Sequence, residues 1–215
     1  ITYNVWGLPS PIKLNHKNLK KIARTIPIYE ADIIGFQETF TRRASVLAGI
    51  QDYNYVAFGP NKSKGKITNS GLLTISKHPI KRVERLQFKK CSGFDCMAAK
   101  GVLLTTITVP KVGDVDVYNT HLNAGKSRKV KWSQINELKR FISTYSTKNP
   151  IILIGDMNIT PETDFHLFMS NDMELIDTHY DLIKKFTDLT PEEYEGSTYV
   201  KKRPFKKSFS KRRLD

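Results

Sequence analysis

Short apolar runs followed by polar residues dominate the hydrophobic pattern of this chain. Residues 151–154 form a continuous apolar run rich in β-branched residues, as in a buried strand, whereas residues 81–88 alternate as an edge or half-buried strand does. Runs of this length favour strands over helices. They predict strands at residues 1–6, 31–36, 69–76, 81–88, 100–109, 115–122 and 150–158.

Apolar residues at helical spacing predict helices between these strands. In residues 16–29, Leu19, Ile22 and Ile26 share one face, Asn15 suits the N-cap, and Pro27 ends or kinks the helix. Further helices are predicted at residues 40–50, at residues 127–146 and after Pro161, which suits a first helical turn. The strands are too many and too hairpin-like for a doubly wound parallel sheet. A layered α/β sandwich with mixed sheets and outer helices fits better.

Composition adds a strong positive charge to this picture. The 215 residues carry a formal net charge of +14, which favours anionic partners such as nucleic acid, acidic lipid or phosphorylated substrates. Residues 201–213 hold eight of the basic side chains, with Phe205 and Phe209 between them. That segment is either a solvated basic loop or a patch that binds phosphates or a membrane surface. The sequence contains no run of about 18 apolar residues, so it predicts no transmembrane helix.

Two cysteines, Cys91 and Cys96, stand with four residues between them. Two cysteines cannot complete a closed zinc site. They form either a local disulfide across Gly93, which would imply an oxidising compartment, or two buried free thiols.

Several predicted strands end in residues with side chains that bind metals or phosphates. These are Asn4, Glu38, His121, Asp156 and Asn158. Strand ends of a sandwich can gather at one rim, and carboxylate and carboxamide oxygens suit Mg²⁺. A histidine beside them can stabilise charge on a phosphate. The pattern predicts metal-assisted hydrolysis of a phosphate ester; for residues 150–158 alone, a strand followed by an Asx turn is the alternative.

Five motifs in order closely resemble the endonuclease/exonuclease/phosphatase superfamily. They are Thr2-Tyr-Asn-Val-Trp-Gly-Leu-Pro9, Gly35-Phe-Gln-Glu38, Asn69-Ser-Gly-Leu-Leu-Thr-Ile-Ser-Lys-His-Pro-Ile80, Asn119-Thr-His-Leu122 and Gly155-Asp-Met-Asn158. The resemblance implies a DNase I-like α/β (α+β) fold: a four-layer sandwich of two mixed β-sheets packed face to face, with helices outside. It implies a single domain over residues 1–215.

Within the superfamily, two segments resemble the neutral sphingomyelinases. One is Asn-Val-Trp-Gly-Leu-Pro at residues 4–9; the other holds Asp95 and Lys100 five positions apart, followed by Gly101. The resemblance implies that this pair belongs to a loop that sets substrate access. The alternative is the start of a strand with a surface ion pair.

The resemblance also implies roles for the strand-end residues. Glu38 is the expected principal Mg²⁺ ligand, with Asn4 in support; Mn²⁺ or Co²⁺ could replace Mg²⁺. His121 and Asn158 are expected to contact the scissile phosphate, and Asp156 to position the attacking water. A satisfied core histidine is the alternative for His121.

One departure concerns the Ser-Asp-His motif with which this family ends, because the chain has none. Asp215 resembles the family's aspartate that supports the histidine of this motif. We therefore expect the sequence to stop before the final strands; a degenerate relative that lacks this motif is the alternative. Without that histidine, hydrolysis should be slower by about 10²–10⁴-fold.

The resulting hypothesis is a Mg²⁺-dependent phosphodiesterase of the phospholipase C type, which hydrolyses sphingomyelin to ceramide and phosphocholine at a phospholipid membrane surface. Secretion or attachment to a membrane surface is expected. A nuclease of the same fold is the alternative, because the net charge suits nucleic acid equally. A non-catalytic membrane- or phosphate-binding relative is the third.

Overall fold

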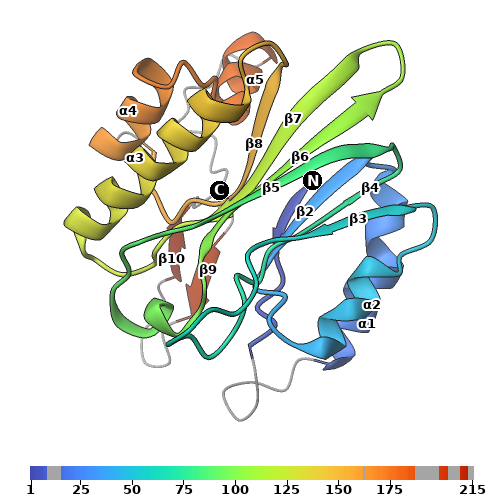
Figure 1. Cartoon of the computed structure of the whole chain (residues 1–215), viewed down its shortest axis with the longest axis horizontal. Coiled ribbons are helices and arrows are strands. Elements are labelled where there is room, and N and C mark those ends of the chain that lie inside the picture. Colours follow the sequence, from blue (N-terminus) through green and yellow to red (C-terminus); the bar gives the residue numbers. More distant parts are fainter. Residues whose placement is uncertain (9–15, 162, 187–198, 203–208, 213–215) are drawn as a thin grey trace. The chain divides into compact units, whose positions relative to one another are not determined.

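The structure, a computed structural model, describes residues 1–8, 16–161, 163–186, 199–202 and 209–212 (Figure 1). Backbone contacts divide the chain into two compact units, Ile1–Met157 and Asn158–Asp215. The first unit contains both four-stranded sheets, and the second contains two helices and a two-stranded ribbon. No helix among the described residues is long and apolar enough to cross a membrane.

The first sheet has the strand order β1-β2-β4-β3. Its strands are β1 (Thr2–Asn4), β2 (Ile33–Gln37), β3 (Tyr55–Phe58) and β4 (Leu73–Ser76). β1 runs parallel to β2, and the other neighbours are antiparallel. The strand predicted from residue 69 starts only at Leu73, because Asn69 Oδ1 accepts the Gly71 N–H in a turn and Gly71 has a φ of +70°. β3 was not predicted.

The second sheet has the strand order β5-β6-β7-β8. Its strands are β5 (Ile80–Gln87), β6 (Gly101–Val109), β7 (Gly113–His121) and β8 (Ile151–Asp156). The first three form an antiparallel meander, and β8 lies parallel to β7. The sheet confirms β5 as an edge strand. It also shows that β8 is not a fully buried strand: it lies at the other edge, with Ile152 45% exposed.

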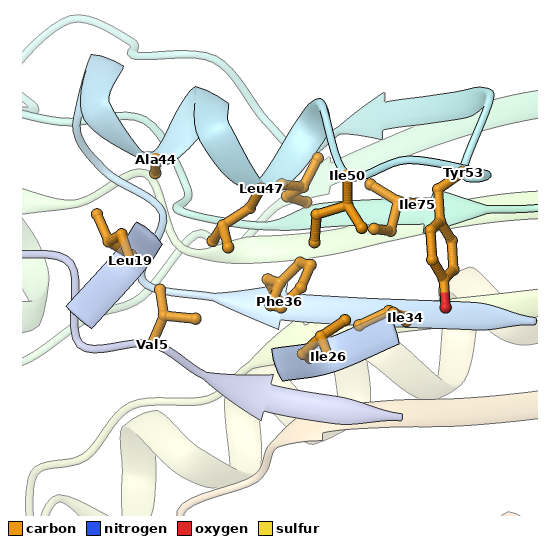
Figure 2. Close-up of a cluster of buried hydrophobic side chains, with 11 residues drawn as sticks. Val5, Leu19, Ile26, Ile34, Phe36, Ala44, Leu47, Ile50, Tyr53 and Ile75 are labelled. Atoms are coloured by element: carbon orange, nitrogen blue, oxygen red, sulfur yellow. The ribbon is translucent and has the colours of Figure 1, made fainter. Parts of the chain in front are cut away.

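Helices cover the outer face of each sheet. On the first sheet lie α1 (His16–Thr25), a 3-10 helix at Ile26–Tyr29, a second at Arg42–Ala44, and α2 (Ser45–Ala48). The helix predicted at residues 16–29 thus changes to 3-10 geometry next to Pro27, which cannot donate a backbone hydrogen bond. Figure 2 shows Leu19 and Leu47 packing towards Phe36 of β2 in this core. On the second sheet lies α3 (Arg128–Tyr145), whose Phe141 meets Tyr118 edge-on.

Between the two sheets lies a buried polar contact rather than a purely apolar one. Asn119 of β7 donates from Nδ2 to the carbonyl oxygens of Phe36 and Leu73, at 3.2 and 3.1 Å. Its Oδ1 accepts from Gln37 Nε2 at 2.8 Å. Both side chains are fully buried. The sheets therefore pack face to face with a fixed register, which confirms the predicted four-layer sandwich.

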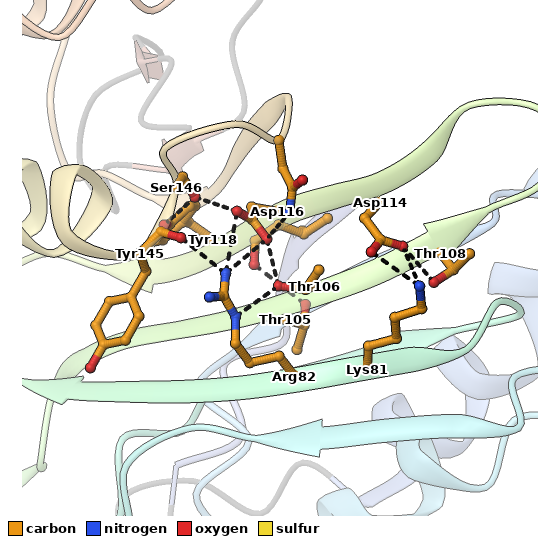
Figure 3. A network of polar contacts seen from close by, with 12 residues as sticks. Lys81, Arg82, Thr105, Thr106, Thr108, Asp114, Asp116, Tyr118, Tyr145 and Ser146 are labelled. Atoms are coloured by element: carbon orange, nitrogen blue, oxygen red, sulfur yellow. Dashed lines mark hydrogen bonds and ion pairs between the residues drawn. The ribbon is translucent and has the colours of Figure 1, made fainter.

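A second polar network fastens α3 to its sheet at the end where β7 begins. Asp116, fully buried, accepts hydrogen bonds from Thr106, Ser146, Asn149 and Arg82 (Figure 3). Arg82 also donates to the Tyr145 carbonyl oxygen at 3.1 Å. A buried carboxylate with this many donors is fully satisfied, so the network serves stability.

The second unit contains α4 (Asp164–Asn171), α5 (Thr178–Phe186) and the antiparallel ribbon of β9 (Tyr199–Lys202) and β10 (Phe209–Arg212). α4 follows Pro161 as predicted, with Thr163 as its N-cap. Within this unit, His166 Nε2 lies 2.9 Å from Asp177 Oδ2. The side chains of the basic segment 201–213 lie outside the described part of the chain, as do Asn15 and Asp215.

Candidate active site

Four strand ends meet at one end of the first unit. β1 ends at Asn4 beside the end of β2, which Glu38 follows, and β7 and β8 end at the paired residues His121 and Asp156. Parallel neighbours end at the same edge of a sheet, and face-to-face packing brings the two edges together. The structure thus gathers these predicted site residues.

Asn4 connects the two sheets at this point. Its Nδ2 donates to Glu38 Oε1 at 2.9 Å and to Asp156 Oδ2 at 3.0 Å. Its Oδ1 accepts the Trp6 N–H at 3.0 Å. Asn4 therefore holds the two carboxylates next to each other through its amide nitrogen. Its oxygen has a second lone pair besides the one that accepts the Trp6 N–H, so it could still serve as the predicted metal ligand.

Glu38 has an unusual backbone and an unusual side chain. Its φ is +60°, a conformation that costs a non-glycine residue about 1–3 kcal/mol and that clusters at functional sites. Gly7 permits the turn, because a Cβ at residue 7 would lie 2.6 Å from the Glu38 carbonyl oxygen, to which Gly7 N–H donates. This left-handed backbone conformation sets the direction in which the Glu38 side chain points after the end of β2.

The Glu38 carboxylate has one oxygen to spare. Oε2 is buried and has no hydrogen-bond partner among the described residues. Burial is the largest influence and raises the pKa of Glu38, against lowering by the Asn4 hydrogen bond and the Lys100 charge. A buried carboxylate oxygen without a donor is unfavourable unless a cation or water meets it. This atom therefore fits a metal ligand.

The donor set suits a cation that keeps much of its water. Among the residues that the structure describes, no three His, Cys, Asp or Glu side chains converge closely enough to hold a metal by themselves. Two carboxylates, Glu38 and Asp156, are brought together here by Asn4. Mg²⁺ is commonly bound by only one or two carboxylates together with waters and substrate phosphate. The residues present thus fit Mg²⁺.

His121 is buried at the end of β7. Its Nε2 lies 3.7 Å from Asp156 Oδ2, too far for a hydrogen bond, and its buried Nδ1 has no partner among the described residues. Burial, followed by the charge of Lys100, holds the pKa of His121 well below its usual value. A neutral imidazole can donate one hydrogen bond and accept another, as a phosphate contact requires.

Asp95 and Lys100 do not form the surface ion pair of the alternative interpretation, because Lys100 is buried. Lys100 Nζ lies 2.9 Å from Asp95 Oδ1 and donates to the Leu122 carbonyl oxygen at 3.0 Å. Asp95 Oδ2 accepts the Ala124 N–H at 2.6 Å. The Lys100 side chain is 4% exposed, and its burial lowers its pKa in spite of Asp95. The pair thus joins the 3-10 helix Gly93–Met97 to the residues after His121.

Lys131 of α3 is a residue at this site that the sequence reasoning missed. It is half-buried, and burial lowers its pKa, opposed by the charges of Asp156 and Asp95. Its charge therefore acts on the same carboxylates as Lys100. Helical spacing places Val130 inward but gives no sign that the charge of Lys131 acts on Asp156 at the end of β8.

Two other predicted residues are not placed at this site. Asn158 belongs to the second unit and has a φ of +49°. Asp215 lies beyond the described residues. Their roles stay predictions.

Cys91 and Cys96 form a disulfide, which settles the choice between a disulfide and two free thiols.

Comparison with known sequences gives two informative similarities. A sphingomyelinase of Mycobacterium tuberculosis is 26% identical over 175 residues, which cover 74% of this chain and 33% of that protein. A phospholipase C of Staphylococcus aureus is 27% identical over 208 residues, covering 84% of this chain and 62% of that protein. The chain thus spans about a third of the mycobacterial relative and less than two thirds of the staphylococcal one.

Among solved structures, a variant of beta toxin from Staphylococcus aureus with bound magnesium ions matches with a TM-score of 0.73 and 24% identity. The match covers 82% of this chain and 70% of the toxin. This likeness shows the fold alone. The sequence profile of the endonuclease/exonuclease/phosphatase family matches residues 1–207, almost the whole chain. The five motifs, the sandwich and this match agree: the chain belongs to the endonuclease/exonuclease/phosphatase family.

Proposed function

We propose that this protein is a Mg²⁺-dependent phosphodiesterase of the phospholipase C type, which hydrolyses sphingomyelin to ceramide and phosphocholine. The observation that carries the proposal is the buried Oε2 of Glu38, which lies beside Asn4 and Asp156 and has no hydrogen-bond partner among the described residues. The relatives named sphingomyelinase and phospholipase C support the lipid substrate.

In the proposed reaction, water attacks phosphorus, the bond from phosphorus to the ceramide oxygen breaks, and that oxygen takes up a proton. Glu38 would hold Mg²⁺, with Asp156 nearby, and the ion would offset negative charge that develops on the phosphoryl oxygens. Mn²⁺ or Co²⁺ could take its place. Asp156 orients the attacking water, with Asn4 fixing the direction of its carboxylate.

His121 and Lys100 have separate parts in this proposal. The neutral His121 donates a hydrogen bond to a phosphoryl oxygen without bringing a second positive charge into the buried site. Lys100 stays clamped to Asp95 and the Leu122 carbonyl oxygen, so it shapes the site wall and adds charge from a distance. Asn158 is proposed as a further phosphate contact, and Asp215 as a support for a histidine.

The proposed setting is a phospholipid membrane outside the reducing cytosol, with the protein secreted or attached to a membrane surface. The Cys91–Cys96 disulfide supports this setting, since disulfides persist in oxidising compartments.

The test is a substrate panel for the full-length protein: sphingomyelin vesicles, phosphatidylcholine vesicles and supercoiled plasmid, each with Mg²⁺ and with EDTA. We expect Mg²⁺-dependent phosphocholine release from sphingomyelin and an intact plasmid. Plasmid nicking without phosphocholine release would overturn the substrate and favour the nuclease. Neither activity would favour the non-catalytic relative.

A further inference from the structure

Two large apolar side chains stand exposed on loops at the end of the first unit that carries the site. Phe94 is 88% exposed and Ile67 is 62% exposed. Phe94 lies in the β5–β6 connection beside Asp95, and Ile67 lies in the β3–β4 connection, whose Gly71 carbonyl oxygen accepts the N–H of Thr39 next to Glu38. Single exposed apolar residues are common on protein surfaces, so the surroundings of these two matter.

The loops that carry Phe94 and Ile67 are fastened to each other. Ile67 N–H donates to the Met97 carbonyl oxygen at 2.7 Å, and Lys66 Nζ donates to the Cys96 carbonyl oxygen at 3.0 Å. The Cys91–Cys96 disulfide closes the backbone on both sides of Phe94. The backbone that carries the two apolar side chains is therefore held in place before any partner arrives, which lowers the entropy lost on binding.

The surroundings of this pair are strongly basic. The same two connections carry the exposed lysines Lys62, Lys64, Lys89 and Lys90. Their one acidic residue, Asp95, is already paired with Lys100. Cations around protruding apolar groups match the interface of a phospholipid bilayer, where apolar side chains enter below the headgroups and lysines meet anionic lipids.

We propose that Phe94, Ile67 and these four lysines form a docking surface that seats the catalytic end of the protein on an anionic phospholipid bilayer. The proposal rests on the proposed function, because it explains how a buried site at this end meets a lipid substrate. It consists of other residues than the basic segment 201–213. Figure 1 shows these connections at the end of the sandwich opposite the β6–β7 turn.

The test measures vesicle binding without turnover. The full-length protein carrying Glu38→Gln is sedimented with vesicles of phosphatidylcholine and sphingomyelin, with and without phosphatidylserine. Phe94→Ser and Ile67→Ser are each added to this background. The matched control is Val112→Ser, which removes an exposed apolar side chain (65% exposed) from the β6–β7 turn. Circular dichroism verifies that each variant is folded.

We expect Phe94→Ser to weaken binding about tenfold, as the loss of a partly buried aromatic ring requires. Ile67→Ser should weaken it by a smaller factor, and Val112→Ser should leave it unchanged. Binding should rise with phosphatidylserine and fall with salt. The proposal would be overturned if Phe94→Ser bound vesicles as strongly as the protein without this change. It would also be overturned if Val112→Ser lost as much affinity as Phe94→Ser, or if the protein did not bind vesicles at all. Because no turnover is needed, binding that depends on Phe94 would stand even if sphingomyelin proved not to be the substrate.

Discussion

Asn4 donates a 3.0 Å hydrogen bond to Asp156, which lies 152 residues further along the chain. The same nitrogen holds Glu38 at 2.9 Å. One amide thus keeps two carboxylates from two different sheets together, where they would otherwise repel each other. The contact forms only when the two sheets pack together, and it positions the carboxylates proposed to bind the metal and to orient the water.

Asn4→Ala should lower both stability and activity. Removing the shared donor leaves two partly buried carboxylates facing each other, and we expect the free energy of unfolding to fall by about 1–3 kcal/mol. Urea unfolding and Mg²⁺-dependent phosphocholine release measure the two effects. The matched control is Asn136→Ala, because among the described residues Asn136 Nδ2 donates only to the Trp132 carbonyl oxygen within α3. Equal behaviour of the two variants would contradict the bridging role.

The strand-end residues were predictable because of how sheets are built. An apolar run that ends in Asn4 or Asp156 predicts that this residue lies at the end of a strand. Pairing and layering follow from the fold class, so the convergence of these ends could be predicted. The burial of Lys100 could not be predicted, because a separation of five residues from Asp95 is compatible with an ion pair on the surface and with a buried one.

Other features needed the tertiary structure. β3 was missed because Tyr55, Val56 and Phe58 are exposed at a sheet edge and show no alternation of polar and apolar residues. Asn119 stands in a recognisable motif, but its role as the link between the sheets depends on Gln37, far away in sequence. Lys131 approaches the site through helix packing, which periodicity does not encode.

Asp95→Ala should leave the buried Lys100 ammonium without its carboxylate. Breaking one partner of a buried pair typically costs about 3–5 kcal/mol, so urea unfolding should show a loss of this order. Asp95→Ala with Lys100→Met should recover part of it. As a control, Lys185→Ala removes the exposed pair with Asp181 and should change stability by less than about 0.5 kcal/mol. A loss as small as the control's would mean that the Asp95–Lys100 pair does not stabilise the fold.

The same Asp95→Ala variant should lose lipid hydrolysis more than hydrolysis of a small soluble phosphodiester, if its loop sets lipid access. Equal losses on both substrates would show that the loop acts on the chemistry rather than on access.

The Asp116 network should make stability sensitive to acid. Burial alone would raise the pKa of Asp116, but hydrogen bonds from Ser146, Thr106 and Asn149, with the charge of Arg82, bring it below the usual 3.8. A carboxyl whose pKa is lower in the folded state stabilises it above the unfolded pKa, and this contribution is lost as the pH falls through the folded pKa. Asp116→Asn should therefore be less stable than wild type at neutral pH, with a gap that narrows below about pH 4. A gap that stays constant with pH would contradict this origin.

His121 should remain neutral where an exposed histidine takes up a proton. Its pKa lies well below 6.5, so its imidazole NMR signals should stay constant as the pH is lowered through that value. Because the unfolded chain does take up the proton, this residue should reduce stability as the pH falls below 6.5. A titration of the folded protein centred near 6.5 would contradict the buried, neutral imidazole.

The most direct measurement compares wild type with Glu38→Gln in Mg²⁺-dependent phosphocholine release from sphingomyelin vesicles, with urea unfolding to verify the fold. Gln keeps the shape and can still meet Asn4, but it lacks the charge that a hard cation needs. We predict that Glu38→Gln abolishes the part of the activity that EDTA removes from wild type and leaves the unfolding transition intact. Undiminished Mg²⁺-dependent release by a folded Glu38→Gln variant would remove Glu38 from the metal site and contradict the account.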